Sequence, residues 1–359
     1  MSDLQIMEQQ DVSPPLSFRE PPLTPPSTNK KPAAEAQHRV IALFNRIQAG
    51  RYTEGNNWIE YWLATGEFDQ IQSNLQQDDA LLKYAEASIR YDYDETKRRL
   101  VVRMPTGVHE FFVDKVEDNI RTQLKVISKG PGRTAQFAKN LRPARSTEIR
   151  FTGSKSRYHP DISFGRKGAK FPGVIFEIAY SQLRLDRLAE SYIVDSNANI
   201  RVVVGLDIAY GKESRKATLS VWRPQISNKT LVVVAEATDE VIRNDKGNSV
   251  GHPGLRLRLS DFTCQKIALE QIGDEDIDIC ISGEQLCEYI AEAEDEVQQA
   301  TYEEPLPDGI NKRKRSETPP EEIRSDDEVK YAEQERRAAK RADHDMDYED
   351  RQSAKSLSE

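Results

Sequence analysis

The chain has 359 residues, of which 37% are hydrophobic and 31% are charged. This composition is too polar for one compact globule of the whole length, so we expect some segments to lack stable structure. No stretch approaches the roughly 20 apolar residues of a membrane span, and the acidic, polar first residues do not resemble a signal peptide. The three cysteines, Cys264, Cys280 and Cys287, are too few for a disulfide framework and match no zinc spacing. We therefore expect a soluble protein from a reducing compartment.

The first segment in chain order is a proline-rich leader over residues 1–32, which we expect to be disordered. It is either a ligand for a proline-recognising domain or, as we favour, a solvated tail. Residues 33–90 are then predicted to form a small helical subdomain, because apolar residues recur at helical spacing. Its three expected helices cover 34–50, 56–75 and 78–89.

Residues 91–272 are predicted to form the main core. A two-stranded hairpin is expected over 89–105, and a helix over 106–128. The strands expected after it cover 149–152, 159–165, 172–182, 199–211, 217–224 and 229–238. An amphipathic helix over 183–195 separates the third strand from the fourth, and a strand and a helix within 251–272 close the core. This order predicts an α+β or α/β fold with a mixed sheet flanked by helices.

The carboxyl-terminal residues, from 273 onward, are more acidic and less apolar than the predicted core. Residues 273–300 are predicted to be an acidic, weakly helical segment, and residues 301–359 a disordered tail. The tail contains a tight basic cluster, Lys312, Arg313, Lys314 and Arg315. Such a cluster suits a nuclear-import receptor or a polyanion, so we expect a nuclear protein, with the cytoplasm as the alternative.

Deleting both tails, residues 1–32 and 301–359, is expected to leave the melting temperature nearly unchanged. Neither segment carries enough apolar area to offset the conformational entropy that ordering it would cost. A thermal melt of the shortened chain checks this prediction. A loss of several degrees would show that one tail is part of the fold.

Basic residues concentrate in the middle of this acidic protein, whose net charge is −9. Between positions 121 and 170 only two acidic residues, Glu148 and Asp161, interrupt 13 basic ones. Phosphate contacts act at short range, so a local basic stretch favours a polyanion-binding surface, with nucleic acid as the first candidate. The alternative is a solvated surface of mixed sign, with distant acidic residues folded over it.

Two carboxylates in the strand-rich region are candidates for chemistry. Glu177 lies inside the apolar run VIFEIAY, where burying it is costly unless it pairs or binds a cation. Asp161 starts the preceding strand, so a hairpin would set the two carboxylates side by side. An Mg²⁺ or Mn²⁺ ion would relieve their repulsion, because both ions prefer oxygen ligands. The alternative is that Glu177 faces water on an edge strand and Asp161 is a turn residue.

An ordered series of segments then resembles a known superfamily. MPTGVHEFFVDKV, HPDISF, PGVIFEIAYSQ, LDRLAESY, VVVGLD, LSVWRP and PGLRLRLSDF follow one another over roughly residues 104–265. The series resembles the PD-(D/E)xK nuclease superfamily, which has the restriction-endonuclease-like fold. It is most similar to a bacterial family of predicted restriction endonucleases with a His-Glu, Pro-Asp and Glu-x-x-x-Ser pattern.

The resemblance implies a metal site and names its residues. Asp161 and Glu177 would ligate Mg²⁺ or Mn²⁺, together with the backbone carbonyl of Ile178. Glu110 would be a further acidic group that holds a metal ion or its water.

The chain departs from the superfamily's pattern at the expected lysine, where Ala179 stands. Gln182 could orient the attacking water in its place, and Arg184 or Arg187 could act on the phosphate. Lys155 and Arg157 are expected to contact nucleic acid by charge.

Three functions follow from this pattern. The first is a magnesium-dependent nuclease that hydrolyses phosphodiester bonds, with DNA favoured over RNA. The second is a catalytically inactive nuclease fold that binds nucleic acid or protein. The third is an α+β interaction protein whose resemblance to nucleases is accidental. Convergence of Glu110, Asp161, Glu177 and Gln182 in one cleft would argue against the third.

Overall fold

The computed structural model of the chain describes residues 35–52, 58–179, 185–209, 214–300 and 333–337. The chain divides into two compact units, Met1–Tyr302 and Glu303–Glu359. In the second unit the described residues, 333–337, are helical. The predictions for the leader, for Gln182 and Arg184 and for the basic cluster at 312–315 fall outside the described residues. The account below concerns the first unit.

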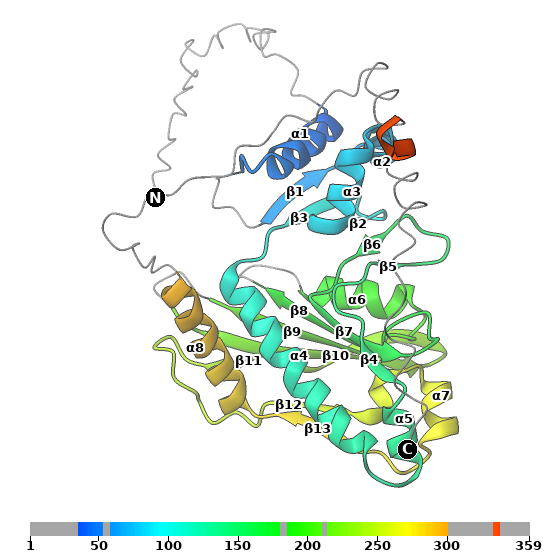
Figure 1. The fold of residues 1–359 in the computed structure, drawn as a ribbon. Helices are drawn as coiled ribbons and strands as arrows, with labels where there is room; N and C mark the ends of the chain where they lie inside the picture. The colour runs from blue at the N-terminus through cyan, green and yellow to red at the C-terminus, as the bar shows by residue number, and fades with distance from the viewer. Residues whose placement is uncertain (1–34, 53–57, 180–184, 210–213, 301–332, 338–359) are drawn as a thin grey trace, which may run out of the picture. The chain divides into compact units, whose positions relative to one another are not determined.

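A five-stranded sheet forms the amino-terminal layer, in the order β1-β3-β2-β6-β5. Its strands are β1 (Trp58–Trp62), β2 (Arg90–Asp94), β3 (Arg99–Arg103), β5 (Ile149–Arg150) and β6 (Arg157–Tyr158), and the helices next to it are α1 (Ala36–Gln48), α2 (Glu67–Gln77) and α3 (Asp79–Ser88). The helices and the sheet share one apolar core, in which Val40, Phe44, Ile71, Leu100 and Val102 are almost fully buried (Figure 1).

The prediction of a single helix over 56–75 is wrong in its first part. Residues Trp58–Trp62 form strand β1, which pairs antiparallel with β3 along its whole length. The sequence WIEYW is rich in aromatic residues that suit a strand, and pairing with β3 decides between the two structures. Helix α2 begins only after Gly66, whose φ of 89° ends any helix that runs into it. Residues 33–90 therefore combine helices and a strand rather than helices alone. Strands β2, β3, β5 and β6, which fall within the predicted main core 91–272 or at its edge, belong to the same sheet as β1.

The central sheet has six strands in the order β11-β10-β9-β8-β7-β4. They are β4 (Leu141–Pro143), β7 (Ile162–Arg166), β8 (Val174–Ala179), β9 (Val202–Ile208), β10 (Ala217–Ser227) and β11 (Thr230–Arg243). Strands β8 and β9 are parallel, and the other neighbours are antiparallel. The parallel pair needs a crossover, which contains helix α6 (Leu185–Asp195). The predicted mixed sheet and α+β class are confirmed.

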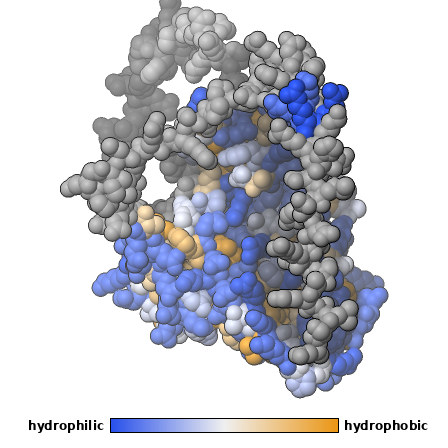
Figure 2. Space-filling view, viewed as in Figure 1, coloured by the Kyte–Doolittle hydropathy of each residue, from blue (hydrophilic) through white to orange (hydrophobic). Residues whose placement is uncertain are grey.

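Residues of β8 and β9 alternate between two apolar cores on the two faces of this sheet. Phe176 and Val204 belong to the core that contains α4 (Gly107–Ser128), whereas Ile175 and Val203 pack with α6. The first core also includes residues of α5 (Gly132–Ala138), β12 (Leu255–Arg258), the short helix Leu259–Phe262, α7 (Gln265–Gln271), β13 (Asp278–Ile281) and α8 (Gly283–Ala300). Outside these cores, the described part of the face in Figure 2 is mostly hydrophilic, with small apolar patches. No helix in the described ranges is long and apolar enough to cross a membrane.

The segment 273–300 belongs to the core, which corrects the expectation of a weakly helical appendage. Leu286, Ile290 and Ala293 are fully buried on one face of α8, which packs beside α4 (Figure 1). Glu294 on the same helix accepts hydrogen bonds from buried Arg243 at 2.8 and 2.9 Å. Acidic residues on the other face of α8 give the sequence its polar character and obscure this narrow apolar stripe.

Candidate functional site

The β7–β8 hairpin brings Asp161 and Glu177 together. Ile162 pairs with Phe176, and continuing this register by one residue sets Asp161 opposite Glu177. The backbone N–H of Ile178 donates to Asp161 Oδ2 at 2.7 Å, which orients the carboxylate. Both side chains are buried. The predicted convergence of these two carboxylates is confirmed, and the alternative of a water-facing Glu177 is wrong.

A guanidinium group lies between the two carboxylates. Arg103 Nη1 is 2.9 Å from Glu177 Oε2 and 3.5 Å from Asp161 Oδ1. Its Nη2 is 3.1 Å from Asp92 Oδ2 and also donates to the backbone carbonyl of His159. Burial lowers the pKa of Arg103, but the three carboxylates outweigh burial and raise this pKa well above its ordinary value. Arg103 therefore stays charged and ties strand β3 of the amino-terminal sheet to the central sheet.

The remaining oxygens of the pair also have partners. The Tyr192 hydroxyl, on α6, donates to Glu177 Oε1 at 2.6 Å. His109 Nε2, at the start of α4, is 3.3 Å from Asp161 Oδ1, and Arg90 Nη1 is 3.6 Å from the same oxygen. Together with the Ile178 N–H and Arg103, these groups engage all four oxygens of Asp161 and Glu177. We call Arg103, His109, Asp161 and Glu177 the ionic cluster.

The cluster shifts the pKa values of its members in opposite directions. Burial alone would raise the pKa of Asp161, but His109 and Arg103 hold this pKa well below its usual range. Burial raises the pKa of Glu177 to about 8, since Arg103 offsets only part of that effect and Asp161 adds to it. Burial lowers the pKa of His109, but Asp161 and Glu110 outweigh it and raise this pKa to about 9. When two carboxyl groups share one site, the pKa of one characteristically falls and the pKa of the other rises.

Glu110 lies at the edge of the cluster rather than inside it. Its side chain, in the first turn of α4, is about half exposed at 46% and pairs with Arg90 Nη1 at 3.2 Å. It is also 3.4 Å from His109 Nδ1. A hydrogen bond from His109 lowers the pKa of Glu110. Glu110 thus reaches Asp161 through His109 and Arg90, and the expected convergence of acidic groups is tightest for Asp161 and Glu177.

The side chains as they lie do not fit a magnesium ion. Mg²⁺ binds oxygen ligands at about 2.1 Å, whereas the Arg103 guanidinium already lies between Asp161 and Glu177, in contact with both carboxylates. Among the described residues, no group of three or more His, Cys, Asp and Glu side chains is placed to hold a metal ion. Arg103 supplies positive charge between the two carboxylates. No local feature of the sequence marks Arg103, because its partners are 11 to 74 positions away.

Arg157 is not on the surface, which corrects the expectation that it contacts nucleic acid. It is buried, with its guanidinium 4.2 Å from the centre of the Tyr91 ring and 5.3 Å from that of Phe68. It pairs with Glu148 at 3.2 Å, and burial lowers its pKa to about 10. Its role is to pack the amino-terminal layer.

The other expected phosphate contacts are exposed but differ in their partners. Lys155 is on the surface and pairs with Asp69 at 2.7 Å, so it is less available than its exposure indicates. Arg187 is exposed on α6. Neither residue lies at the ionic cluster, and both remain predictions as nucleic-acid contacts.

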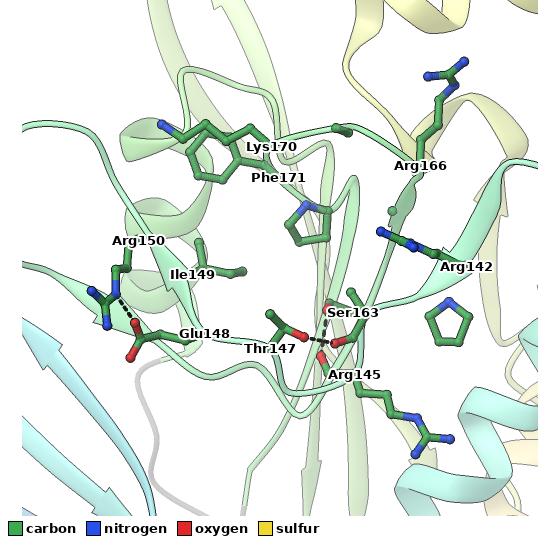
Figure 3. Close-up of a pocket in the computed structure, with 15 residues that line it drawn as sticks. Arg142, Arg145, Thr147, Glu148, Ile149, Arg150, Ser163, Arg166, Lys170 and Phe171 are labelled. Atoms are coloured by element: carbon green, nitrogen blue, oxygen red, sulfur yellow. Dashed lines mark hydrogen bonds and ion pairs between the residues drawn. The ribbon is translucent and has the colours of Figure 1, made fainter. Parts of the chain in front are cut away.

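A basic cavity of about 460 Å³ lies along β7 (Figure 3). Three segments line it: residues 142–150, strand β7, and the connection 169–172 between β7 and β8. The five cations of its wall are Arg142, Arg145, Arg150, Arg166 and Lys170. Its carboxylate, Glu148, pairs with Arg150 and also lies 3.6 Å from His159. The cavity gathers part of the basic stretch predicted between positions 121 and 170 into one place.

No protein-family model matches the chain, and no curated protein matches its sequence. The site is therefore interpreted from its own geometry.

Proposed function

We propose that this protein is a non-catalytic nucleic-acid-binding module, built on a restriction-endonuclease-like core in which Arg103 stands in place of a metal ion. The observation that carries the proposal is the position of the Arg103 guanidinium, in contact with both Asp161 and Glu177. On this proposal the guanidinium lies where an ion shared by the two carboxylates would otherwise bind. The cluster then serves as a structural link between the two sheets.

The order of elements supports the choice of core. Helix α4 carries the His-Glu pair, β7 follows Pro160-Asp161, and β8 carries Glu177, as in the series that resembles the nuclease superfamily. Helix α6 and strands β9 and β10 come next. The pairing of Asp161 with Glu177 across neighbouring strands is the geometry that the resemblance implies. These observations favour descent from a nuclease over an accidental resemblance.

The distribution of charge supports nucleic acid as the partner. Within the described ranges, Arg142, Arg166 and Lys170 have no carboxylate partner, although the chain as a whole is acidic. Such unpaired cations are available to replace counterions on a phosphate backbone. A protein partner remains the alternative for this surface.

A magnesium-dependent nuclease acting on DNA is the second candidate. The observation in its favour is the close approach of Asp161 and Glu177, with His109 and Glu110 beside them. This function requires the Arg103 guanidinium to leave the carboxylate pair. It also requires a substitute for the missing lysine at Ala179.

A cleavage assay with Mg²⁺ and Mn²⁺ separates the two candidates. We expect the wild-type chain to bind single- and double-stranded DNA and RNA with salt-dependent affinity and to cleave none of them. We also expect its melting temperature to stay constant when either metal is added. A metal ion that bound the folded state would raise this temperature.

Asp161→Asn and Asp186→Asn form a matched pair for the same assay. Asp186 is exposed on α6, outside the ionic cluster. On our proposal neither variant changes nucleic-acid binding by more than about threefold, since neither side chain contacts the ligand. Metal-dependent cleavage that Asp161→Asn abolishes and Asp186→Asn retains would establish the nuclease instead.

We also propose a nuclear location and an import receptor as partner, from the basic cluster Lys312–Arg315. This proposal rests on the sequence alone, because the cluster lies outside the described residues.

A further inference from the structure

The outer edge of strand β11 is covered along only part of its length. This strand is the last one on its side of the central sheet (Figure 1). Near its carboxyl end Arg243 pairs with Ser249 on the outer side, and the Ile242 carbonyl accepts a hydrogen bond from the Val250 N–H. In the described part of the chain, no segment pairs with the outer edge of residues 230–235. The sheet therefore has an open edge there.

The open half of β11 lacks the features that usually protect an edge strand. Charged side chains and bulges discourage a second strand from pairing with an exposed edge. Residues 230–235 carry no charge, and their register with β10 is regular. The carboxylates of the strand, Glu236, Asp239 and Glu240, and all of its register shifts lie in the other half. The chain thus protects one half of this edge and leaves the other half available.

The turn before β11 determines which backbone groups point outward. Residues 228–229 have φ values of 50° and 62°, as in the two-residue type I′ turn of a tight hairpin. The residues that flank such a turn bond to each other, and bonded pairs then alternate along the ladder. Leu231, Val233 and Ala235 therefore direct their N–H and C=O groups away from β10. Pro224, which has no N–H, lies opposite Val233 and agrees with this alternation.

We propose that residues 230–235 pair antiparallel with the same residues of a second copy of the chain, about a two-fold axis at Val233. Leu231 then lies opposite Ala235 of the second copy, so the outward backbone groups of both strands form hydrogen-bonded pairs. Val232 and Val234 are 36% and 40% exposed, and each lies opposite the other across the axis. Their side chains cover one another in the dimer. This inference does not depend on the proposed function.

The charges beside the open half favour a second copy in this register. Glu236 lies opposite Thr230 of the second copy, so no like charges face each other. Lys229, the exposed turn residue before Thr230, places a cation near the same exposed carboxylate. An axis at Thr238 would instead set Glu236 opposite Glu240, and like charges directly opposite are destabilising. The uncharged half is thus the part of the strand that is complementary to itself.

Sedimentation velocity of the full-length chain, over about a hundredfold range of concentration, tests the proposal. We expect the wild type to pass from one copy to two as its concentration rises. Val232→Lys/Val234→Lys is expected to weaken the dimer by about tenfold or more, because lysines then face lysines at two cross-strand positions. In the matched variant, Val232→Lys/Val234→Glu, each introduced lysine faces an introduced glutamate. Its dimer is expected to stay within about threefold of the wild type.

The outcomes decide both the occupant and the register. Loss of the dimer in the lysine pair alone, with thermal melts showing that both variants fold, supports the proposal. Equal weakening in the two variants, or a dimer that the lysine pair leaves unchanged, would overturn it. A wild type that is a monomer at every concentration would also overturn it. Slow hydrogen exchange at Val233 in that monomer would assign the edge to a segment of the same chain. Nucleic acid is absent from this experiment, so none of its outcomes bears on the proposed function.

Discussion

Arg103→Met is expected to lower the free energy of unfolding by about 3–5 kcal/mol, since it leaves buried carboxylates without their cation. Methionine keeps much of the volume of the arginine stem, so the decrease in the free energy of unfolding comes from the lost charge more than from lost packing. Asp92, Asp161 and Glu177 all lie within 3.5 Å of the Arg103 guanidinium and lose its compensation together. Urea denaturation of the wild type and the variant measures the difference.

Arg99→Met is the matched control on the same strand. Arg99 is 25% exposed and lies 3.5 Å from Glu60, itself partly exposed, so we expect a change of about 0–1 kcal/mol. Adding Asp161→Asn to Arg103→Met should recover part of the stability, because Asp161 is the ionised member of the pair and the amide removes one uncompensated charge. If Arg103→Met costs no more than Arg99→Met, Arg103 does not hold the carboxylates together and its role in place of a metal is wrong.

The ionic cluster also predicts a loss of stability at alkaline pH. The folded pKa of His109 is raised to about 9, whereas the unfolded value is about 6.5. Between these two values the folded state keeps a proton on His109 that the unfolded state has lost. The stabilisation that this proton provides is complete below pH 6.5 and is lost as the pH rises through 9. The shift corresponds to about 3 kcal/mol. Unfolding free energies of wild type and His109→Gln, measured between these pH values, should converge as the pH rises.

His38→Gln is the control for this pH dependence. The His38 side chain on α1 is 65% exposed and far along the chain from the cluster. We expect the difference between this variant and the wild type to stay the same across the range. A His109→Gln difference that is equally flat would mean that Asp161 and Glu110 do not raise the pKa of His109 in the folded state.

Local patterns in the sequence determined most of the helices and strands, and also the pairing of Asp161 with Glu177. Helix α4 follows from apolar periodicity, and strands β8 and β9 follow from nearly continuous apolar runs. Thr106 caps α4 by accepting a hydrogen bond from the His109 N–H at 3.3 Å. The pairing of Asp161 with Glu177 follows from the hairpin between β7 and β8, since adjacent strands in one chain fix their own register. These features depend on residues close together in the sequence, which is why local reasoning reaches them.

Only the tertiary structure decided what surrounds that pair. Arg103 reaches Glu177 from 74 positions away, and Tyr192 reaches it from a helix on one face of the sheet. Periodicity states which face of a strand is buried, but it does not state which charge from another layer meets it. The same limit explains strand β1, which exists because β3 pairs with it, and the basic cavity, which three separate segments build. The sequence thus identified the carboxylates, and the packing of two sheets supplied the arginine that neutralises them.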